Sequence, residues 1–191
     1  GFFMLGELMI GLILSLSLKV IFAGIQMGGE IVGFQMGLSM AHLIDPQSGV
    51  STPVISQICY LLGTLIFLSI DGHHWFFQAL LQSFQLLAPG EIHIRSGLYQ
   101  HLVGLMGYMF VIAIKIAAPV MVVLIFIQSA LGILSKAVPQ VNILLNSFPL
   151  TISVGLLFLM FSIDLFLPYF QALFEETSKG LVLTLLPLMQ E

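Results

Sequence analysis

The sequence predicts an all-α membrane protein, and three observations lead to that fold class. Apolar residues make up 59% of the 191 residues, and the mean hydropathy is +1.11. Charged residues make up only 7%, whereas a soluble domain carries about 25% because its surface faces water. The apolar residues form long runs without the alternation of a β-strand. We therefore expect polytopic, membrane-type helical hairpins surrounded by lipid or by partner proteins.

The amino-terminal half divides into three predicted helical blocks, judged against the roughly 20 residues that span a bilayer. The first block, Phe2–Ala41, is longer than one straight span, and the second, Val54–Ile70, is close to the minimum. The third block, Trp75–Ala88, ends at a Pro-Gly pair and carries a narrow wedge of glutamines, which suits an interfacial helix. The uneven lengths suggest that partner subunits cover some helices in place of lipid.

The carboxyl-terminal half holds two further blocks. Gly97–Ser135 is twice the length of a span and contains Lys115 and Pro119. Because proline interrupts a helix, we expect a hairpin or two packed helices bent near that pair. The next block runs over Leu144–Phe174, and a short helix over Gly180–Met189 closes the chain.

Composition and spacing argue against several function classes. The net charge of −4 forms no run, so no nucleic-acid partner is expected. Cys59 is the only cysteine, which excludes an internal disulfide and a Cys-pair metal site. His73 and His74 point about 100° apart on a helix and have no acidic or Cys ligand at i+3 or i+4. With no phosphate loop and no Gly-x-Ser-x-Gly motif, we expect no enzyme activity, no metal and no cofactor.

The first block carries a helix-packing pattern. Small residues recur at every fourth position, which lets helix backbones approach closely in lipid. Glu30 lies on a polar stripe that we expect to face a neighbouring subunit or an aqueous path. Two roles for Glu30 stay open, pairing with a neighbour or a proton relay, and the first is favoured. The predicted packing residues are Gly29, Glu30, Gly33 and Gly37, and the stripe comprises Ser15, Lys19, Gln26, Glu30, Gly33 and Gly37.

The polar break at residues 42–53 has definite turn chemistry. Proline fixes φ, Ser-Gly permits positive φ, and a proline can start the following helix. Non-helical backbone at membrane depth survives only beside protein or a water-filled cavity. The break is therefore either a surface connector or a re-entrant plug. Its turn-forming residues are Asp45, Pro46, Ser48, Gly49 and Pro53, and it is flanked by Met27, Met36 and Met40, which either seal an irregular pore or form simple core.

A long motif around this break resembles one protein family. The run Gly29–Ala41 reads Gly-Glu-Ile-Val-Gly-Phe-Gln-Met-Gly-Leu-Ser-Met-Ala and is followed by Asp45-Pro46 and Pro53. This string resembles the signature of the FliR/SctT family, the export-gate protein R of the bacterial type III secretion apparatus. The similarity continues through Asp71-Gly72-His73 with Trp75, through Leu131–Leu134 and through Phe148-Pro149. It therefore covers nearly the whole chain.

The resemblance implies a non-enzymatic subunit of a multi-subunit flagellar export gate in the bacterial inner membrane, within the flagellar basal body. It implies that one such subunit joins five P and four Q subunits in a closed channel for unfolded flagellar proteins. The B-type export protein and lipid are further expected partners. Residues 42–53 would plug the pore, with an apolar seal where relatives often carry aromatic residues. The expected plug and gating residues are Gln35, Met36, Met40, Leu43, Asp45, Pro46, Ser48, Gly49 and Pro53.

The main alternative is a self-contained secondary transporter for small solutes. That fold requires broken helices in corresponding halves, and the chain has one marked Gly/Pro break without a second copy. We therefore favour the export gate. Family members carry further apolar helices ahead of this point, which agrees with the apolar start. We expect residues 1–191 to form one helical domain that lacks amino-terminal helices.

Overall fold

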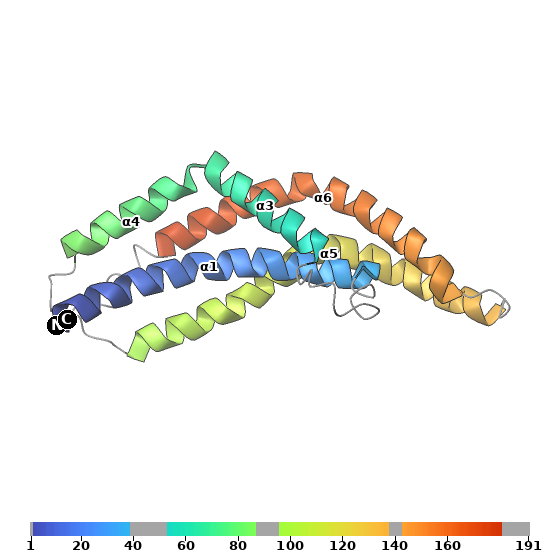
Figure 1. Ribbon diagram of the computed structural model, residues 1–191, viewed down its shortest axis with the longest axis horizontal. Helices are drawn as coiled ribbons and strands as arrows, with labels where there is room; N and C mark the ends of the chain where they lie inside the picture. The colour runs from blue at the N-terminus through green and yellow to red at the C-terminus, as the bar shows by residue number, and fades with distance from the viewer. Residues whose placement is uncertain (1, 39–52, 87–95, 138–142, 181–191) are drawn as a thin grey trace, which may run out of the picture. The chain divides into compact units, whose positions relative to one another are not determined.

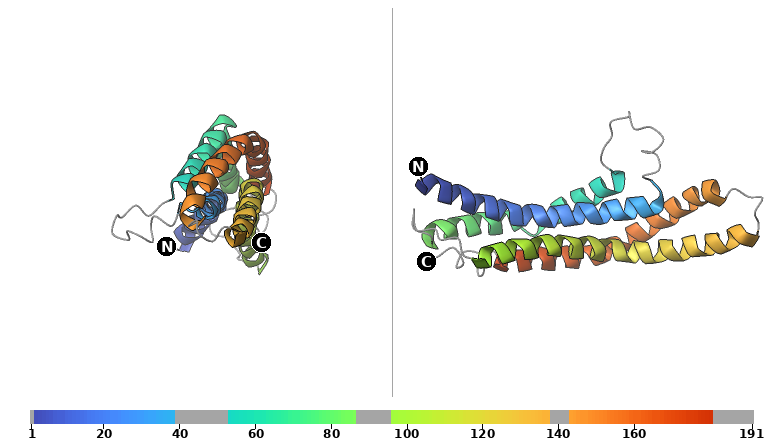
Figure 2. Two further views of the ribbon diagram at one scale, coloured as in Figure 1. Left: turned by 90° about the vertical axis from the view of Figure 1, so that its right-hand side faces the viewer. Right: turned by 90° about the horizontal axis from the view of Figure 1, so that it is seen from below.

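The protein is all-helical over the residues that the structure, a computed structural model, describes: 2–38, 53–86, 96–137 and 143–180 (Figure 1). Its helices are α1 (Phe2–Met36), α3 (Val54–Ser69), α4 (Gly72–Leu86), α5 (Ser96–Ala137) and α6 (Ile143–Gly180). Figure 2 shows the same helices from two other sides. Since these four ranges contain no strand, the predicted all-α class is confirmed.

The longest helix differs from its prediction in one respect. The expected hairpin or pair of helices around Lys115 and Pro119 is wrong, because α5 continues through Pro119 as one α-helix of 42 residues. Proline cannot donate the i→i−4 hydrogen bond, but the residues around it are held by packing. Ile116 and Val120 are both fully buried. In membrane-type helices such packing commonly supports a proline within the helix.

The last described helix also extends past its prediction. It begins at Ile143 and ends at Gly180, six residues after the expected end at Phe174. Pro149 and Pro168 both lie within it and neither ends it. The short helix expected over Gly180–Met189 lies almost wholly outside the described residues.

Three of the helices are long and apolar enough to cross a membrane. They are Gly11–Met36, Leu102–Ala137 and Ser147–Thr177, with mean hydropathies of 1.6, 2.8 and 2.2. The pair Val54–Ser69 and Gly72–Ser83 meets the same test only when taken together, and it is bent by 68° at its break. The described part of the chain thus holds three candidate spans, or four if the bent pair counts as one.

The chain divides into two compact units, and α1, α3, α5 and α6 each contribute a stretch to both. Unit 1 comprises residues 1–24, 62–111 and 167–191, and unit 2 comprises residues 25–61 and 112–166. An aromatic cluster forms the centre of unit 1. The ring of Phe67 lies 5.7 Å from that of Phe22 and 5.0 Å from that of Phe174, measured between centroids. Edge-to-face and tilted contacts of this kind stabilise aromatic pairs by more than the burial of their apolar area alone.

Aliphatic side chains from four helices form the core of unit 2. Met36 of α1 is fully buried, as is Ile112 of α5. Further buried members of this core are Ile25, Val32, Ile55, Cys59, Ile116, Ala117, Val120, Leu124 and Leu159. This core surrounds the carboxyl end of α1, where the sequence predicts functional residues.

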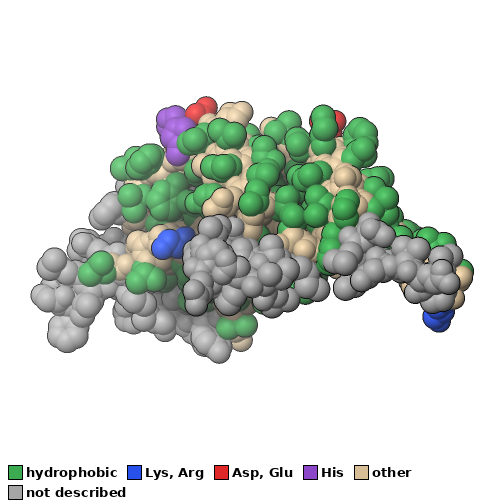
Figure 3. All heavy atoms as spheres, turned by 45° about the vertical axis from the view of Figure 1, so that its right-hand side comes forward, with side chains coloured by type: hydrophobic (Ala, Val, Ile, Leu, Met, Phe, Trp, Pro, Cys, Tyr) green, Lys and Arg blue, Asp and Glu red, His purple; other side chains and the backbone are tan. Residues whose placement is uncertain are grey.

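Large apolar side chains also lie on the outside of the molecule. Figure 3 shows hydrophobic side chains over most of the described surface on the face in view. Phe126 of α5 and Met160 of α6 are each 71% exposed. Exposing so much apolar surface to water is unfavourable. These residues therefore require lipid or protein around them, as the composition predicts.

Candidate functional site

The carboxyl end of α1 is shaped by a glycine in the left-handed region of backbone conformation. Gly37 has a φ of 88°. Its amide donates to the carbonyl of Phe34 at 3.0 Å, and the amide of Leu38 donates to the carbonyl of Gly33 at 3.1 Å. These two bonds and the positive φ define a Schellman motif. Gly37, predicted as a packing residue, therefore also ends the helix.

Two side chains from distant helices complete the hydrogen bonding of this helix end. The last four carbonyls of an α-helix have no donor within the helix, and the Schellman bonds satisfy only two of them. The Nε2 of Gln128 on α5 donates to the carbonyl of Gln35 at 2.9 Å. The Oγ1 of Thr151 on α6 lies 3.0 Å from the carbonyl of Met36 and donates to it. All four terminal carbonyls of α1 are thus satisfied within unit 2.

The side chains at this end pack as closely as its backbone. The side-chain Nε2 of Gln35 donates to the Oε1 of Gln128 at 3.0 Å, and the Nε2 of Gln128 donates back to the backbone carbonyl of Gln35. Met36 lies over Gly155 of α6, where a Cβ would come within 2.6 Å of the methionine Cε. A Cβ on Gly37 would likewise come within 2.7 Å of the ring of Phe148. The end of α1 is therefore held by both α5 and α6.

The glycines earlier in α1 contact two different helices. A Cβ on Gly29 would lie 2.7 Å from the Cα of Ser56, which places α1 against the backbone of α3. A Cβ on Gly28 would lie 3.0 Å from the carbonyl oxygen of Ala113 on α5. At Gly33 the nearest atom is the Cβ of Ile55 at 3.6 Å, an ordinary contact. Close backbone approach thus occurs at Gly28 and Gly29, with more room at Gly33.

The predicted polar stripe of α1 divides into a buried part and an exposed part. Gly33 is buried within unit 2, whereas Lys19 and Glu30 are exposed on the chain. No hydrogen-bond donor or cation within the described residues pairs with Glu30. Its role as a contact residue stays a prediction.

Most of the predicted plug lies outside the described residues. This applies to Met40, Leu43, Asp45, Pro46, Ser48 and Gly49. Pro53 is described, and its carbonyl accepts from the amide of Gln57 at 3.2 Å, which makes it the residue that caps the start of α3. Its Cβ lies 3.9 Å from the position of a Cβ on Gly33. The chain therefore returns from the break beside α1.

Several residues of this site were not predicted from the sequence. Thr151 and Gly155 stand four residues apart on α6, so they share a face in the small-xxx-small spacing of packed membrane helices. That spacing was a usable signal. Gln128 lies 93 residues from Gln35, and nothing in the local pattern predicts which helix end a solitary glutamine reaches.

A second cluster lies at the turn between α3 and α4, in unit 1. Asp71 has a φ of 56°, and its Oδ1 lies 3.4 Å from the Nδ1 of His74 and 3.9 Å from the Nε2 of His73. Candidate ligand atoms of the three residues lie within 4.8 Å of one another. The carboxylate precedes α4, where the helix dipole favours an anion. We interpret the cluster as an acidic cap, and the expected lack of a metal stays a prediction.

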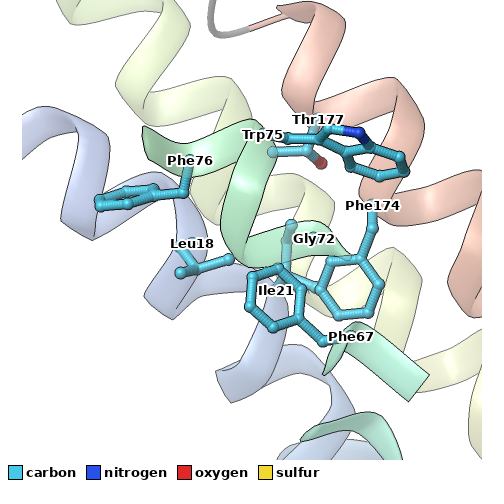
Figure 4. A pocket seen from close by; sticks show the side chains of 8 residues that line it. All are labelled: Leu18, Ile21, Phe67, Gly72, Trp75, Phe76, Phe174 and Thr177. Atoms are coloured by element: carbon cyan, nitrogen blue, oxygen red, sulfur yellow. The ribbon is translucent and has the colours of Figure 1, made fainter. Parts of the chain in front are cut away.

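A small apolar cavity lies beneath this turn. Figure 4 shows Phe67, Phe174 and Trp75 around it, with Gly72 of the turn lying between them. The cavity has a volume of about 20 Å³, which is room for roughly one water molecule. It is too small to hold an organic cofactor or a substrate. The carboxyl end of α1 therefore remains the better candidate for function.

Comparison with known proteins identifies the family. Residues 1–177 match the family described as bacterial export proteins, family 1. The chain is 35% identical over 170 residues to the flagellar biosynthetic protein FliR of Pectobacterium carotovorum subsp. carotovorum and 33% identical over 170 residues to that of Escherichia coli (strain K12). It is 34% identical over 157 residues to that of Bacillus subtilis (strain 168).

These matches cover 89%, 89% and 81% of this chain, respectively. The chain spans 65%, 65% and 61% of the length of the three relatives, so it corresponds to somewhat less than two thirds of each. The resemblance to FliR drawn from the Gly29–Ala41 motif is thereby confirmed. The chain belongs to the bacterial export proteins, family 1.

Proposed function

We propose that this chain is a subunit of the flagellar type III protein export gate. In this role it forms, with P and Q subunits, a closed channel that passes unfolded flagellar proteins across the bacterial inner membrane. The observation that carries the proposal is the match of residues 1–177 to a family of bacterial export proteins. Three helices of membrane-spanning length support it. An export family does not favour the alternative of a transporter for small solutes.

The expected partners follow from the same proposal. One such subunit would join five P and four Q subunits in the flagellar basal body, together with the B-type export protein. The exposed apolar side chains of α5 and α6 support contact with partner subunits or lipid. Glu30 and Lys19, which are exposed on the mainly apolar α1, would face a partner or an aqueous path, since charge facing lipid is costly.

The proposed plug is the segment from residue 42 to Pro53. The described residues closest to it in the chain lie in unit 2: α1 ends in a hydrogen-bonded cap at Gly37 and Leu38, and Pro53 lies next to Gly33 directly before α3. Gln35 and Met36 would position the plug from the last turn of α1. Met40 and Leu43 would supply its apolar seal, and Asp45, Pro46, Ser48 and Gly49 would set its turns.

Co-purification tests the assembly. The full-length protein, tagged and extracted from flagellated cells in a mild detergent, should elute with P and Q subunits in one complex of fixed composition. Native mass spectrometry then gives the number of each subunit. A monomer or a homo-oligomer free of other apolar subunits would contradict the gate assignment.

An ion-leak measurement tests the plug. Deleting Gln47–Ser51 should raise ion flux through the closed complex in liposomes, because the remaining segment is too short to fill the pore. The matched control replaces the same five residues with a Gly-Ser linker of equal length. Leak from both variants assigns the seal to the side chains, whereas leak from the deletion alone assigns it to segment length. An unchanged leak in both removes the plug assignment.

A further inference from the structure

The two long-range hydrogen bonds at the end of α1 differ from ordinary packing contacts. Each joins a backbone carbonyl of α1 to a side chain whose own helix is distant in sequence, by 93 residues for Gln128 and by 115 residues for Thr151. We call Gln35, Met36, Gln128 and Thr151 the α1 clasp. The clasp supplies the only donors among the described residues to the last two carbonyls of α1.

The Thr151 half of the clasp has an alternative acceptor within reach. Its Oγ1 lies 3.0 Å from the carbonyl of Met36, and 3.1 Å from the carbonyls of both Ser147 and Phe148 in its own helix. A hydroxyl has one hydrogen to donate. When Met36 moves away, Thr151 can therefore donate to α6 without leaving an unsatisfied donor. Ser and Thr in helices commonly make this bond to the carbonyl one turn earlier.

The hydrogen bond from Gln128 to the carbonyl of Gln35 can also break without leaving a buried, unpaired donor. Gln128 is exposed on the chain, and its carboxamide already forms a second bond with the side chain of Gln35. Water or a partner group can replace the carbonyl of Gln35 there. The side chain of Met36 is flexible and rests on Gly155, and because it is fully buried its withdrawal requires the surrounding core side chains of unit 2 to repack.

We infer that Gln128 and Thr151 are positioning residues that hold the carboxyl end of α1 in the closed channel, and that their exchange of hydrogen-bond partners is a step in opening. This inference rests on the proposed function, because five residues separate the end of α1 from the segment proposed as the plug. An element that moves between two states needs two sets of satisfied contacts. The described residues show the first set, and for Thr151 they also show the second, which is the carbonyls of Ser147 and Phe148 in its own helix.

The test uses the assembled complex and two substitutions. Thr151→Val removes the hydroxyl at nearly constant volume, and Gln128→Leu removes the carboxamide at an exposed position where folding is not at risk. Thr151→Ser keeps the hydroxyl and should restore wild-type behaviour. Ser162→Ala on α6 is the matched control, because the Ser162 hydroxyl bonds only the carbonyl of Phe158 in its own helix.

The first measurement is hydrogen exchange of the amides of Gly37 and Leu38. Loss of one net hydrogen bond should speed this exchange by about fivefold in either single variant and by roughly 25-fold in the double variant. Ser162→Ala and Thr151→Ser should leave it unchanged. If neither single variant speeds exchange, the clasp does not hold α1 and the inference is wrong.

The second measurement is ion leak through the same complexes in liposomes. Both single variants should leak more than wild type and less than the Gln47–Ser51 deletion. Faster exchange without added leak would overturn the role of the clasp in closure and leave the proposed function intact. If the deletion itself causes no leak, the proposed plug fails, and the exchange data alone then decide whether the clasp positions α1.

Discussion

Two helix ends in this molecule solve the same geometric problem in different ways. Both α1 and α3 are followed by a residue with positive φ: Gly37 at 88° comes directly after α1, and Asp71 at 56° comes two residues after α3. Both ends also approach an aromatic ring closely. At α1 the residue that adopts the positive φ is also the one that faces the ring of Phe148. At α3 the two tasks are separate, because Asp71 adopts the positive φ and Gly72 faces the ring of Phe67.

The partners of the two ends differ as well. The hydrogen bonds at the end of α3 are local: the amide of Ile70 donates to the carbonyl of Ile66 at 3.0 Å, and the amide of Asp71 donates to the carbonyl of Leu68 at 3.1 Å. The end of α1 depends on Gln128 and Thr151, which belong to other helices. A local turn forms wherever its own residues fold. An end completed by distant helices is formed only when those helices are in place, which makes its position responsive to them.

The largest effect is expected from Gly37→Ala. It forces a residue with a Cβ into the left-handed region and drives that Cβ into the ring of Phe148. Together these should lower the free energy of unfolding by about 2–4 kcal/mol. Denaturant unfolding of the purified complex, followed by circular dichroism, measures it. In the background of Phe148→Ala, Gly37→Ala should cost less stability, because the clash with the ring is gone. A double-mutant cycle measures this coupling between the two substitutions. If the cycle shows no coupling, the ring does not define this end.

A smaller effect is expected from Gly72→Ala. The new Cβ would overlap the ring of Phe67, but Gly72 lies at the start of α4 with no positive φ, and alanine favours helix. The net loss should be about 1–2 kcal/mol. The same unfolding measurement applies, with Phe67→Leu as the relieving change. A loss as large as that of Gly37→Ala would contradict the separation of tasks between Asp71 and Gly72.

Within α1, two glycines one turn apart should respond differently. Gly29→Ala requires a shift of the α3 backbone at Ser56, so we expect a loss of about 1–3 kcal/mol. Gly33→Ala places its Cβ 3.6 Å from Ile55, an ordinary distance, and the gain in helix propensity of up to about 1 kcal/mol should make it neutral or stabilising. Equal losses in the unfolding measurement would show that the spacing of small residues, and not the close approach at Gly29, determines packing.

Much of the fold was predictable because helix ends leave local signals. Pro53 and Asp71-Gly72 mark where α3 begins and where α3 turns into α4. The first block was expected to run to Ala41, whereas α1 ends at Met36 before the positive φ of Gly37. Long apolar runs fixed the presence and type of the five helices. Pro119 was misleading because a proline weakens a helix by a fixed local amount, whereas the burial of its neighbours depends on tertiary packing that no local pattern reports.

The candidate site was predictable only in part, for the same physical reason. The Gly29–Gly37 spacing indicated close helix packing, and the glycines at 28 and 29 do meet other helices. The choice of Gln128 and Thr151 as partners of Gln35 and Met36 depends on how three helices dock. A hydrogen bond across 93 or 115 residues has no periodicity to detect. The segment that holds Met40 to Gly49 lies outside the described residues, so its role stays a prediction.

The smallest effect is expected at Asp71. Asparagine and aspartate tolerate positive φ better than other residues with a Cβ, so Asp71→Asn keeps the turn and removes only the charge. The carboxylate and both imidazoles are substantially exposed, and such pairs contribute less than about 1 kcal/mol. Asp71→Val at the same position should cost at least about 1 kcal/mol more, because a β-branched residue is strained in this region. Unfolding of the two variants, compared at equal salt, separates charge from backbone conformation. If Asp71→Asn lowers the free energy of unfolding as much as Asp71→Val, the carboxylate contributes more than an acidic cap does. The turn after α3 would then depend on more than its local backbone bonds, and the contrast with the end of α1 would fail.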